Sequence, residues 1–363
     1  MKVVQVVPTI GDESSGPSYS VPGLCRGLVE NGCDVSLHFV GRITAREFPF
    51  PIHTYPVKRF PHPRIGRSPE MLKGLKEACK NADIIHNNSF WMFPNVYPAR
   101  AKMGTKCKLV NAPRGTLAEW SLKHHWLQKK LFGWFGGQYA AMAAADMWHA
   151  TCEKEYEEIR ALGYKQPVVI VPIGIDLPEI ETHVKEDAER TRRVVFFGRL
   201  HKVKGVDRLV FAWEQVVREG WELVIAGPDC GMLGTLKSIV AERKLSRVSF
   251  VGEINGHAKY EFLAEGDICV LPSDTENFGV TVVEALASGT PVVASQGTPW
   301  QGLGRERCGK WVPIGVEPLV AALNELMTMS DGERADMGIR GREWMARDFS
   351  WKGIGAKMKD RKS

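Results

Sequence analysis

The chain has 363 residues, a length typical of two ordinary domains or one large one. Its residues are 44% hydrophobic, 9% aromatic and 25% charged, which excludes a disordered or fibrous protein. The net charge of +6 is unevenly distributed, because residues 1–170 carry 22 Lys/Arg against 14 Asp/Glu and residues 171–363 carry 26 against 28. This asymmetry predicts that the two halves meet different partners and that the first half favours an anionic one.

The sequence contains no apolar run of the roughly 18–20 residues that a membrane-spanning helix requires. Residues 1–8 hold a single Lys and an apolar stretch interrupted by Gln5, which favours a buried strand over a signal peptide. The eight cysteines form no C-x-x-C motif, so we expect neither a disulfide framework nor a zinc site. We therefore expect a cytoplasmic protein.

Short apolar runs alternate with longer amphipathic stretches, a pattern typical of βαβ units and parallel sheets. In the first half the predicted strands are Lys2–Val7, Asp34–Val40, Ile52–Tyr55, Ile84–His86, Lys108–Ala112, Met147–Ala150 and Val168–Val171. In the second half they are Arg193–Phe197, Glu222–Ala226, Val248–Gly252, Ile268–Leu271, Pro291–Ala294 and Lys310–Val312. We predict two doubly wound α/β domains over residues 1–175 and 193–345, joined by the polar, proline-containing segment 176–192. A helix over residues 346–363 is predicted to pack back on the first domain.

The first candidate binding segment follows the first strand, where Ser14-Ser15-Gly16-Pro17-Ser18 leads into a predicted helix over residues 19–31. A glycine loop at a helix start exposes backbone N–H groups suited to an anion. The segment lacks the G-x-G-x-x-G pattern of a nicotinamide dinucleotide site. An ordinary strand-to-helix turn explains it equally well.

A second candidate segment follows the strand Arg193–Phe197. Arg199 and Lys204 lie in the loop between this strand and the next helix, and Gly205 permits close backbone approach. Two cations beyond the carboxyl edge of a parallel sheet can hold a diphosphate. Taken alone, the two cations also fit a solvated basic turn.

A third candidate segment follows the strand Ile268–Leu271. It carries Glu276 in a polar loop, and then Asn277-Phe278-Gly279 opens a helix that holds Glu284 one turn from its start. Backbone N–H groups at residues 279–281 (Gly279, Val280, Thr281) would attract a phosphate, whereas Glu284 beside them would repel it. A ligand with phosphates flanked by sugar hydroxyls, a nucleoside diphosphate sugar, removes this conflict. A Glu284 that merely complements the helix dipole would leave Glu276 and the glycine unexplained.

The third segment resembles the Glu-x7-Glu signature of the family 4 glycosyltransferases, retaining enzymes of the GT-B fold. Other similarities to this family are spread over most of the chain: Thr151 and Glu155, Val171–Asp176, Gly198–Leu200, Lys204-Gly205, Ile225–Asp229, Phe250–Gly252 and Phe349–Trp351. The resemblance implies two Rossmann-like domains that face each other across a cleft. The N-terminal domain would bind the acceptor and the C-terminal domain the nucleotide-sugar donor.

The resemblance also implies roles for the donor-binding residues. Arg199 and Lys204 would bind the diphosphate and stabilise the leaving group, with Gly16 close by. Glu284 would hold the ribose hydroxyls. Glu276 would hold the hydroxyls of the donor sugar, together with the backbone of residues 277–279 (Asn277, Phe278 and Gly279).

Two further positions follow from the resemblance. The nucleobase would lie near Gly252, Glu253 and Ile254, after their strand. Many relatives place a histidine after the fourth or fifth N-terminal strand, where this chain has Asn88 and Arg114. Arg114 is therefore a catalytic candidate that contacts the donor phosphate or the acceptor.

The chain contains no Asp-x-Asp motif, and its histidines form no ligand cluster, so we expect transfer without a metal or other cofactor. No carboxylate is marked as a nucleophile for double displacement. Same-face attack, as proposed for the family, fits better, with the leaving phosphate helping to deprotonate the acceptor hydroxyl. The donor would be UDP- or GDP-linked.

Residues 113–135 combine aromatic side chains with lysines, which suits a helix on an anionic membrane surface. The aromatic residues are Trp120, Trp126, Phe132, Trp134 and Phe135, and the lysines are Lys123, Lys129 and Lys130. A second basic set lies in the same domain: Lys58, Arg59, Arg64, Arg67, Lys73, Lys76 and Lys80. We expect peripheral association with the inner face of the cytoplasmic membrane and a lipid-linked saccharide acceptor of polysaccharide assembly. A helix that packs within the domain and has a solvated basic face fits equally well.

Three alternative functions stay open at this point. The first is a soluble glycosyltransferase with a small-molecule acceptor. The second, a nicotinamide-dependent sugar-nucleotide oxidoreductase, would need a Tyr-x3-Lys pair that the sequence lacks. The third, a two-lobed sugar-binding protein, would need export. We expect no nucleic-acid partner, because no known reading module is present.

Overall fold

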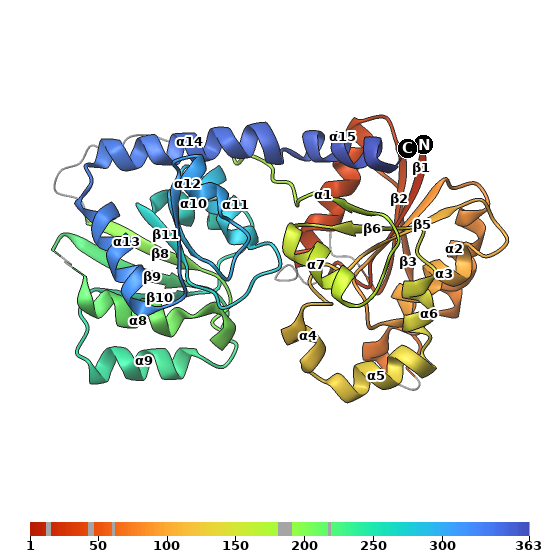
Figure 1. The fold of residues 1–363 in the computed structure, drawn as a ribbon, viewed down its shortest axis with the longest axis horizontal. Helices are drawn as coiled ribbons and strands as arrows, with labels where there is room; N and C mark the ends of the chain where they lie inside the picture. The colour runs from red at the N-terminus through yellow and green to blue at the C-terminus, as the bar shows by residue number, and fades with distance from the viewer. Residues whose placement is uncertain (12–15, 43–46, 60–61, 181–190, 217–218, 363) are drawn as a thin grey trace. The chain divides into compact units, whose positions relative to one another are not determined.

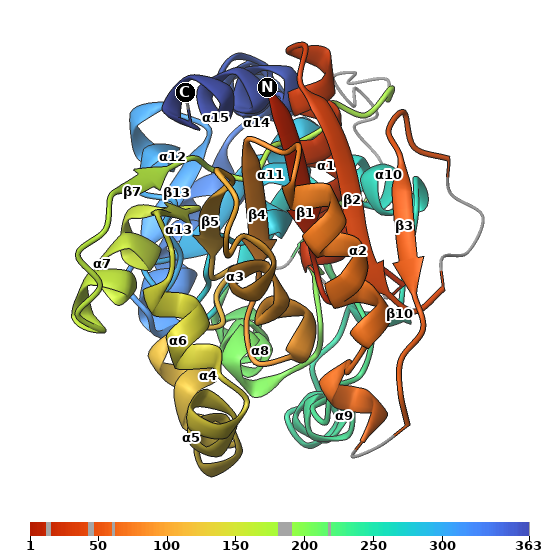
Figure 2. The same ribbon diagram turned by 90° about the vertical axis from the view of Figure 1, so that its right-hand side faces the viewer.

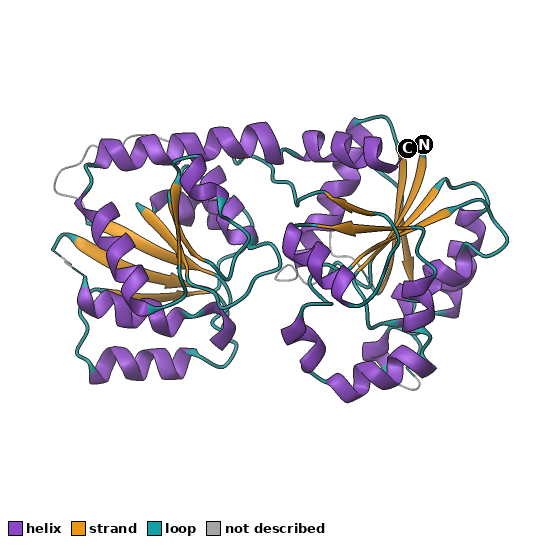
Figure 3. Cartoon of the chain, viewed as in Figure 1, coloured by secondary structure: helices purple, strands orange, loops and turns teal. Residues whose placement is uncertain are grey.

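The computed structural model describes residues 1–11, 16–42, 47–59, 62–180, 191–216 and 219–362. They form two compact units, Met1–Gly174 with Trp351–Ser363 and Ile175–Ser350. In each unit a parallel sheet carries helices on both faces (Figure 3). This is the α/β architecture that the alternating pattern predicts.

The sheet of the N-terminal unit has seven parallel strands in the order β3-β2-β1-β4-β5-β6-β7 (Figure 2). Strand β1 pairs with both β2 and β4, so the chain reverses its direction of winding at β1. Ligands of open parallel sheets bind beyond the carboxyl ends at such a point. The strands are β1 (Lys2–Val6), β2 (Asp34–Val40), β3 (Ile52–Tyr55), β4 (Ile84–Asn88), β5 (Lys108–Ala112), β6 (Met147–Ala150) and β7 (Val168–Ile170).

Two helices of the N-terminal unit bury leucine and methionine side chains in its core: α1 (Gly16–Glu30) buries Leu24 and Leu28, and α2 (Pro69–Cys79) buries Met71 and Leu75. The other helices of this unit are η1 (Pro63–Ile65), η2 (Phe93–Asn95), α3 (Tyr97–Ala101), α4 (Glu119–Lys123), α5 (Trp126–Phe135), α6 (Gln138–Ala143), α7 (Glu153–Ala161) and α15 (Trp351–Lys362).

Strand β4 is longer than its apolar run, Ile84–His86, predicts. It continues through Asn87 and Asn88, which are fully buried. Their side-chain amides can be buried because they form hydrogen bonds with other side-chain amides. Asn87 Nδ2 donates to Asn111 Oδ1 at 3.0 Å, and Asn88 Nδ2 donates to Gln5 Oε1 at 3.0 Å. Hydrogen bonding removes the cost of burying these polar groups, so hydropathy alone ends the strand too early.

The sheet of the C-terminal unit has six parallel strands in the order β10-β9-β8-β11-β12-β13, with the change of winding at β8 (Figure 1). The strands are β8 (Arg192–Phe197), β9 (Trp221–Ala226), β10 (Val248–Gly252), β11 (Ile268–Leu271), β12 (Val292–Ser295) and β13 (Gly309–Val312). The helices are η3 (Lys202–Lys204), α8 (Val206–Gln215), α9 (Leu233–Glu242), α10 (Ala258–Glu265), α11 (Val280–Ala287), α12 (Gly302–Arg305), α13 (Val316–Thr328) and α14 (Asp331–Phe349).

The C-terminal helical region differs from the single helix expected over residues 346–363. Ser350 leaves the helical conformation, with φ −60° and ψ 140°, so α14 ends before it and α15 begins after it. Helix α15 packs on α1, and a Cβ at Gly27 would lie 2.1 Å from the carbonyl oxygen of Trp351. The contact is therefore between backbones, which the small residues Gly27 and Gly355 permit. Of the expected connection 176–192, residues 181–190 lie outside the described residues.

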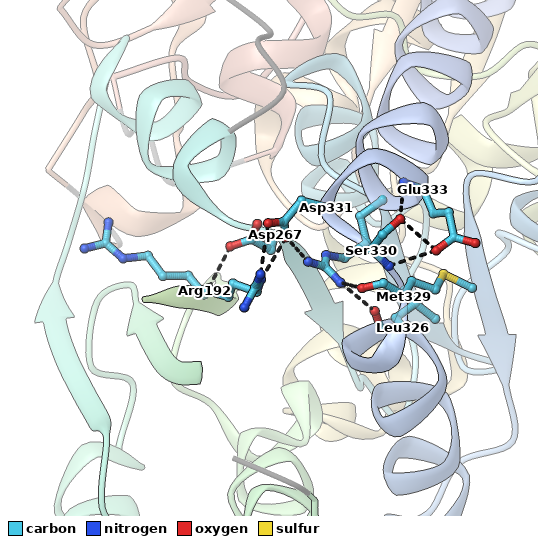
Figure 4. Close-up of polar contacts among 9 residues, drawn as sticks. Arg192, Asp267, Leu326, Met329, Ser330, Asp331 and Glu333 are labelled. Carbon is cyan, nitrogen blue, oxygen red and sulfur yellow. Dashed lines mark hydrogen bonds and ion pairs between the residues drawn. The ribbon is translucent and has the colours of Figure 1, made fainter. Parts of the chain in front are cut away.

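A partly buried ion cluster fixes the start of α14 to the first strand of the C-terminal unit (Figure 4). Arg192 donates to Asp331 from Nε at 2.8 Å and from Nη2 at 3.0 Å. Arg334 is 3% exposed and donates to the same carboxylate and to the carbonyl oxygens of Leu326 and Met329. Its guanidinium also lies 4.9 Å from the ring centre of Trp221. The attraction of both guanidiniums to Asp331, together with the hydrogen bonds of Arg334, offsets the cost of removing these charges from water.

Within the described part of the chain, no helix has the length and hydropathy needed to cross a bilayer.

Candidate active site

The carboxyl edge of the C-terminal sheet brings together residues from two of the candidate segments. Lys204 ends η3 after β8, and Glu276 lies in the loop after β11. Lys204 Nζ contacts Glu276 Oε1 at 2.5 Å, and the two side chains are only 16% and 13% exposed. A cation and a carboxylate 72 residues apart in the sequence thus meet at the point where the sheet changes its winding.

Backbone contacts hold these two loops against each other. The amide of Asp274 donates to the carbonyl oxygen of Val203 at 2.8 Å. Gly205 has φ +65°, and a Cβ there would lie 2.3 Å from the carbonyl oxygen of Pro272, so no side chain fits. On the other side, the hydroxyl of Ser273 donates to Glu276 Oε1 at 2.7 Å. The carboxylate of Glu276 therefore has a fixed position before any ligand binds.

The start of α11 lies beside the end of β8. The Thr281 hydroxyl donates to the carbonyl oxygen of Phe197 at 3.2 Å. Gly279 adopts φ +79°, a left-handed conformation that glycine takes without strain, and it turns the chain into the helix. The Phe278 side chain is 5% exposed and packs on Trp300, so it belongs to the core. Val280 and Asn277 are half-buried at this edge.

Glu284 is one turn inside α11, and its side chain is only 6% exposed. Lys259 of α10 contacts Glu284 Oε1 from Nζ at 2.5 Å, and the Lys259 side chain is 19% exposed. Burial raises the pKa of the Glu284 carboxyl, and the lysine opposes that rise. Burial also works against the charge on Lys259, but the carboxylate keeps the pKa of Lys259 above its ordinary value.

Lys259 is the residue of this site that the sequence analysis missed. It occupies the second position of α10, in the connection after β10, so it follows the carboxyl end of a strand as the other candidates do. It is also the one lysine or arginine between Gly252 and the end of α10. These two facts could have singled it out, but only the fold shows that α10 lies against α11.

Other predicted donor-binding residues are more open. Arg199 is exposed, and among the described residues its side chain has no hydrogen-bond or ion-pair partner. Gly252 ends β10, which is the outer strand of the sheet, and accepts a hydrogen bond from the Gly227 amide at 2.6 Å. Gly252 and Glu253 are exposed, and Ile254 is half-buried. The Lys259–Glu284 ion pair ties the chain that follows them to α11.

The carboxyl edge of the N-terminal sheet holds Arg114, directly after β5. Its Nε and Nη2 donate to Asn88 Oδ1 at 3.2 and 3.0 Å, so the two residues at the expected histidine positions contact each other. Asn88 is fixed in turn by Gln5 of β1, beside the change of winding. Burial lowers the pKa of Arg114 to about 10, which still leaves it charged at neutral pH. His86 is fully buried within β4, beside His149.

Arg114 lies on a strained loop that a buried carboxylate supports. Its φ is +54°, which is rare for residues other than glycine and is a feature found at functional sites. Glu155 is fully buried and accepts hydrogen bonds from the backbone amides of Gly115 and Thr151, both at 2.7 Å. Burial raises the pKa of Glu155, and these two amides oppose the rise.

Gly16 opens α1 after β1, with no atom within 4 Å of a Cβ built on it. The rest of the predicted glycine loop, residues 12–15, lies outside the described residues. Among the residues that the structure describes, no group of three or more His, Cys, Asp or Glu is arranged to hold a metal ion.

Two family models match the chain, one on each half. Residues 15–179 match "Glycosyltransferase Family 4", and residues 179–344 match "Glycosyl transferases group 1". Among curated proteins, a D-inositol 3-phosphate glycosyltransferase of Jonesia denitrificans is 33% identical over 169 residues, 40% of each chain. A GDP-mannose-dependent monoacylated alpha-(1-6)-phosphatidylinositol monomannoside mannosyltransferase of Corynebacterium glutamicum is 28% identical over 214 residues, 52% of this chain and 54% of that one.

The alignments span about half the length of these curated relatives, or less. Among solved structures, the Anabaena protein HepE in complex with UDP and glucose superimposes with a TM-score of 0.75 at 16% identity, covering 99% of both chains. At that identity the likeness concerns the fold alone. The paired family matches and the two parallel sheets agree: the chain belongs to the family 4 glycosyltransferases and has their GT-B fold.

Proposed function

We propose that the protein is a retaining, metal-independent glycosyltransferase that moves a hexose from a UDP- or GDP-linked donor to a lipid-linked saccharide. The Lys204–Glu276 ion pair is the observation that carries the proposal. A cation for the diphosphate and a carboxylate for the sugar hydroxyls lie in contact at the ligand-binding edge of the C-terminal sheet. A donor would replace this contact, with its phosphates on Lys204 and its sugar hydroxyls on Glu276.

The rest of the C-terminal edge complements the remaining parts of such a donor. Arg199 is exposed and supplies a second cation for the diphosphate. The N–H groups at the start of α11, residues 279–281, favour the same anion. Glu284 accepts hydrogen bonds from the ribose, and the base lies near residues 252–254. HepE, which shares the fold, was solved with UDP and glucose.

The reaction exchanges two bonds at the anomeric carbon. The bond from this carbon to the phosphate oxygen breaks, and a bond to the acceptor hydroxyl oxygen forms on the same face of the sugar. The electron pair of the broken bond leaves with the nucleoside diphosphate, whose charge Arg199 and Lys204 stabilise. The proton of the acceptor hydroxyl passes to an oxygen of the leaving phosphate.

The acceptor side rests on the N-terminal unit. Arg114 would contact an anionic group of the acceptor or the donor phosphate, since its guanidinium is held in place by Asn88. A lipid-linked saccharide suits surface polysaccharide, lipopolysaccharide or O-antigen assembly by a peripheral protein on the cytoplasmic face of the membrane. The mannosyltransferase of Corynebacterium glutamicum, by its name, uses a lipid acceptor.

A small phosphorylated acceptor is a second candidate. The observation that favours it is Arg114 itself, and the Jonesia denitrificans relative is named for an inositol phosphate acceptor. One assay distinguishes the two candidate acceptors: it compares the rate of transfer to a soluble sugar phosphate with the rate of transfer to a lipid-linked saccharide in detergent.

The first experiment is thermal unfolding with added ligands. UDP or GDP is expected to raise the unfolding temperature, whereas NAD and free hexoses are expected to leave it unchanged. A screen of nucleotide sugars then identifies the donor, and the anomeric proton coupling of the product by NMR reports retention. Stabilisation by none of the nucleotides would contradict the proposal.

The variant Glu276→Gln tests the role of the carboxylate. We expect it to lower transfer by two or more orders of magnitude, about 3 kcal/mol in the barrier. Glu325→Gln is the matched control, because Glu325 also contacts a lysine, Lys310, at 2.5 Å but has an exposed side chain. Wild-type transfer by Glu276→Gln, or an equal loss in the control, would refute the role.

A further inference from the structure

Helix α5 presents its apolar face outward. Large exposed side chains repeat along it at positions 126, 127, 131, 134 and 135, a spacing that puts them on one side of a helix. Their exposed fractions are 59% for Trp126, 53% for Leu127, 50% for Leu131, 71% for Trp134 and 87% for Phe135. In a soluble domain this face of an amphipathic helix normally covers the core, so its outward position needs an explanation.

The opposite side of α5 is firmly seated, so the exposed face is not a consequence of a loose helix. Phe132 packs on Phe93 with ring centres 5.2 Å apart. Gly133 is buried against Tyr139, where a Cβ would lie 2.3 Å from the ring. Lys129 turns inward, donating to the carbonyl oxygen and to the hydroxyl of Ser121. Helices α4 and α5 lie at the periphery of the N-terminal unit (Figure 2).

The adjoining helix α4 extends the same surface. Trp120 is 49% exposed and stacks on His124, with ring centres 5.7 Å apart. We call the exposed side chains of these two helices the apolar patch: Trp120, Trp126, Leu127, Leu131, Trp134 and Phe135. Three of the six residues of the patch are tryptophans, which prefer the boundary between lipid and water.

The charges around the apolar patch are positive. Lys130 is exposed on α5 between Trp126 and Trp134. The only acidic residue of segment 113–135, Glu119, is paired with Lys123 at 2.6 Å.

The loop around η1 adds two exposed arginines, Arg64 and Arg67. This loop packs on η2, since a Cβ at Gly66 would lie 3.0 Å from Pro94, and η2 carries the Phe93 that supports α5. The surroundings of the patch therefore repel cationic surfaces and attract anionic ones.

We infer that the apolar patch is a membrane-binding surface that inserts Trp126, Trp134 and Phe135 into the interface of an anionic bilayer. The basic residues around it contact the lipid headgroups, and the helix axis lies in the plane of the membrane. The inference deepens the proposed function. It rests on that function only for the choice of a lipid-linked acceptor, which a membrane-bound surface would bring close to the N-terminal unit. Lipid binding itself needs neither donor nor acceptor, so it is tested separately.

The experiment is flotation of the full chain with vesicles, without donor. The probes are vesicles of phosphatidylglycerol and phosphatidylcholine in equal parts, and vesicles of phosphatidylcholine alone. We expect the chain to bind the vesicles that contain phosphatidylglycerol, and this binding should weaken as the salt concentration rises. The partition constant for phosphatidylcholine vesicles should be at least about tenfold lower. In Leu131→Ser/Phe135→Ser, partition into the anionic vesicles is expected to fall by about tenfold or more, because two apolar side chains no longer insert.

The matched control is Met103→Ser/Ile339→Ser, which removes two exposed apolar side chains from other surfaces, 76% and 43% exposed. This variant is expected to bind as the wild type does. Circular dichroism and unfolding temperature check that Leu131→Ser/Phe135→Ser stays folded, as expected for exposed positions. Absence of binding at low salt, or equal losses in both variants, would overturn the inference. Self-association through the patch without lipid binding, seen by sedimentation, would also overturn it and would assign the face to a second copy of the chain.

Discussion

Replacing Lys259 by Met tests whether this lysine keeps the buried Glu284 carboxylate ionised. The two side chains are in contact at 2.5 Å, and their exposed fractions are only 19% and 6%. The variant leaves a buried carboxylate without its cation. Loss of one partner of a buried ion pair costs about 3–5 kcal/mol, and the partial exposure of Lys259 places this case at about 3 kcal/mol.

The sign of the pH dependence follows from the direction of the pKa shift. Burial raises the pKa of Glu284 above its ordinary value of 4.5, and removing Lys259 raises it further. Between 4.5 and this raised pKa the folded state binds more protons than the unfolded state. The free energy of unfolding therefore falls by about 1.36 kcal/mol for each pH unit over that window. The difference between variant and wild type should be small below pH 4.5 and largest above the raised pKa of Glu284, up to the pH at which Lys259 loses its proton.

Urea unfolding of Lys259→Met and of the wild type at pH 5 and pH 8, followed by circular dichroism, measures this difference. Lys310→Met is the control, because its pair with Glu325 has the same 2.5 Å contact but its side chains are more open, 34% and 53% exposed. We expect Lys310→Met to lower the free energy of unfolding by less than about 1 kcal/mol, with little dependence on pH. Adding Glu284→Gln to Lys259→Met should restore most of the stability. If Lys259→Met is destabilised equally at pH 5 and at pH 8, the reasoning is refuted.

Two further predictions concern the other buried charges. Arg334→Met should destabilise the C-terminal unit by about 2–4 kcal/mol in urea unfolding, because it leaves two carbonyl oxygens and part of the Asp331 charge unpaired; a change below about 1 kcal/mol would contradict this. Arg114→Lys should lower kcat/KM for transfer by about tenfold or more with little change in unfolding temperature, since a lysine cannot keep both contacts with Asn88 Oδ1. Transfer at the wild-type rate would exclude a role for the guanidinium.

The fold could be predicted from the sequence to a large extent. Each predicted strand is present. The central strands are buried on both faces of their parallel sheets, so they are continuous apolar runs that are easily recognised in a sequence. One error lies where polar groups are buried. Strand β4 continues through Asn88 because its amide is hydrogen-bonded to Gln5, a residue 83 positions away. A second error is the helix break at Ser350, where the sequence has no proline or glycine that would predict it.

The candidate site was predicted in part. Lys204 and Glu276 each follow a strand, so the sequence places both at one edge, but their direct contact depends on the close approach at Gly205. The sequence did not identify Lys259 as a site residue, because a single lysine near the start of a surface helix is common. Its importance comes from Glu284, which lies on another helix and is buried there.

The sequence by itself determined the alternation of strands and helices, the edges where ligands could bind and the concentration of aromatic and basic residues in segment 113–135. Periodicity, charge and hydropathy are local properties, and they are sufficient for these conclusions. Only the tertiary structure decided which face of α5 is covered, with Phe132 inside and Phe135 in solvent. It also decided that Glu276 and Glu284 each have a lysine partner. The physical reason is that burial and pairing depend on neighbours distant in the chain, and such neighbours are defined only when the sheet and its helices pack together.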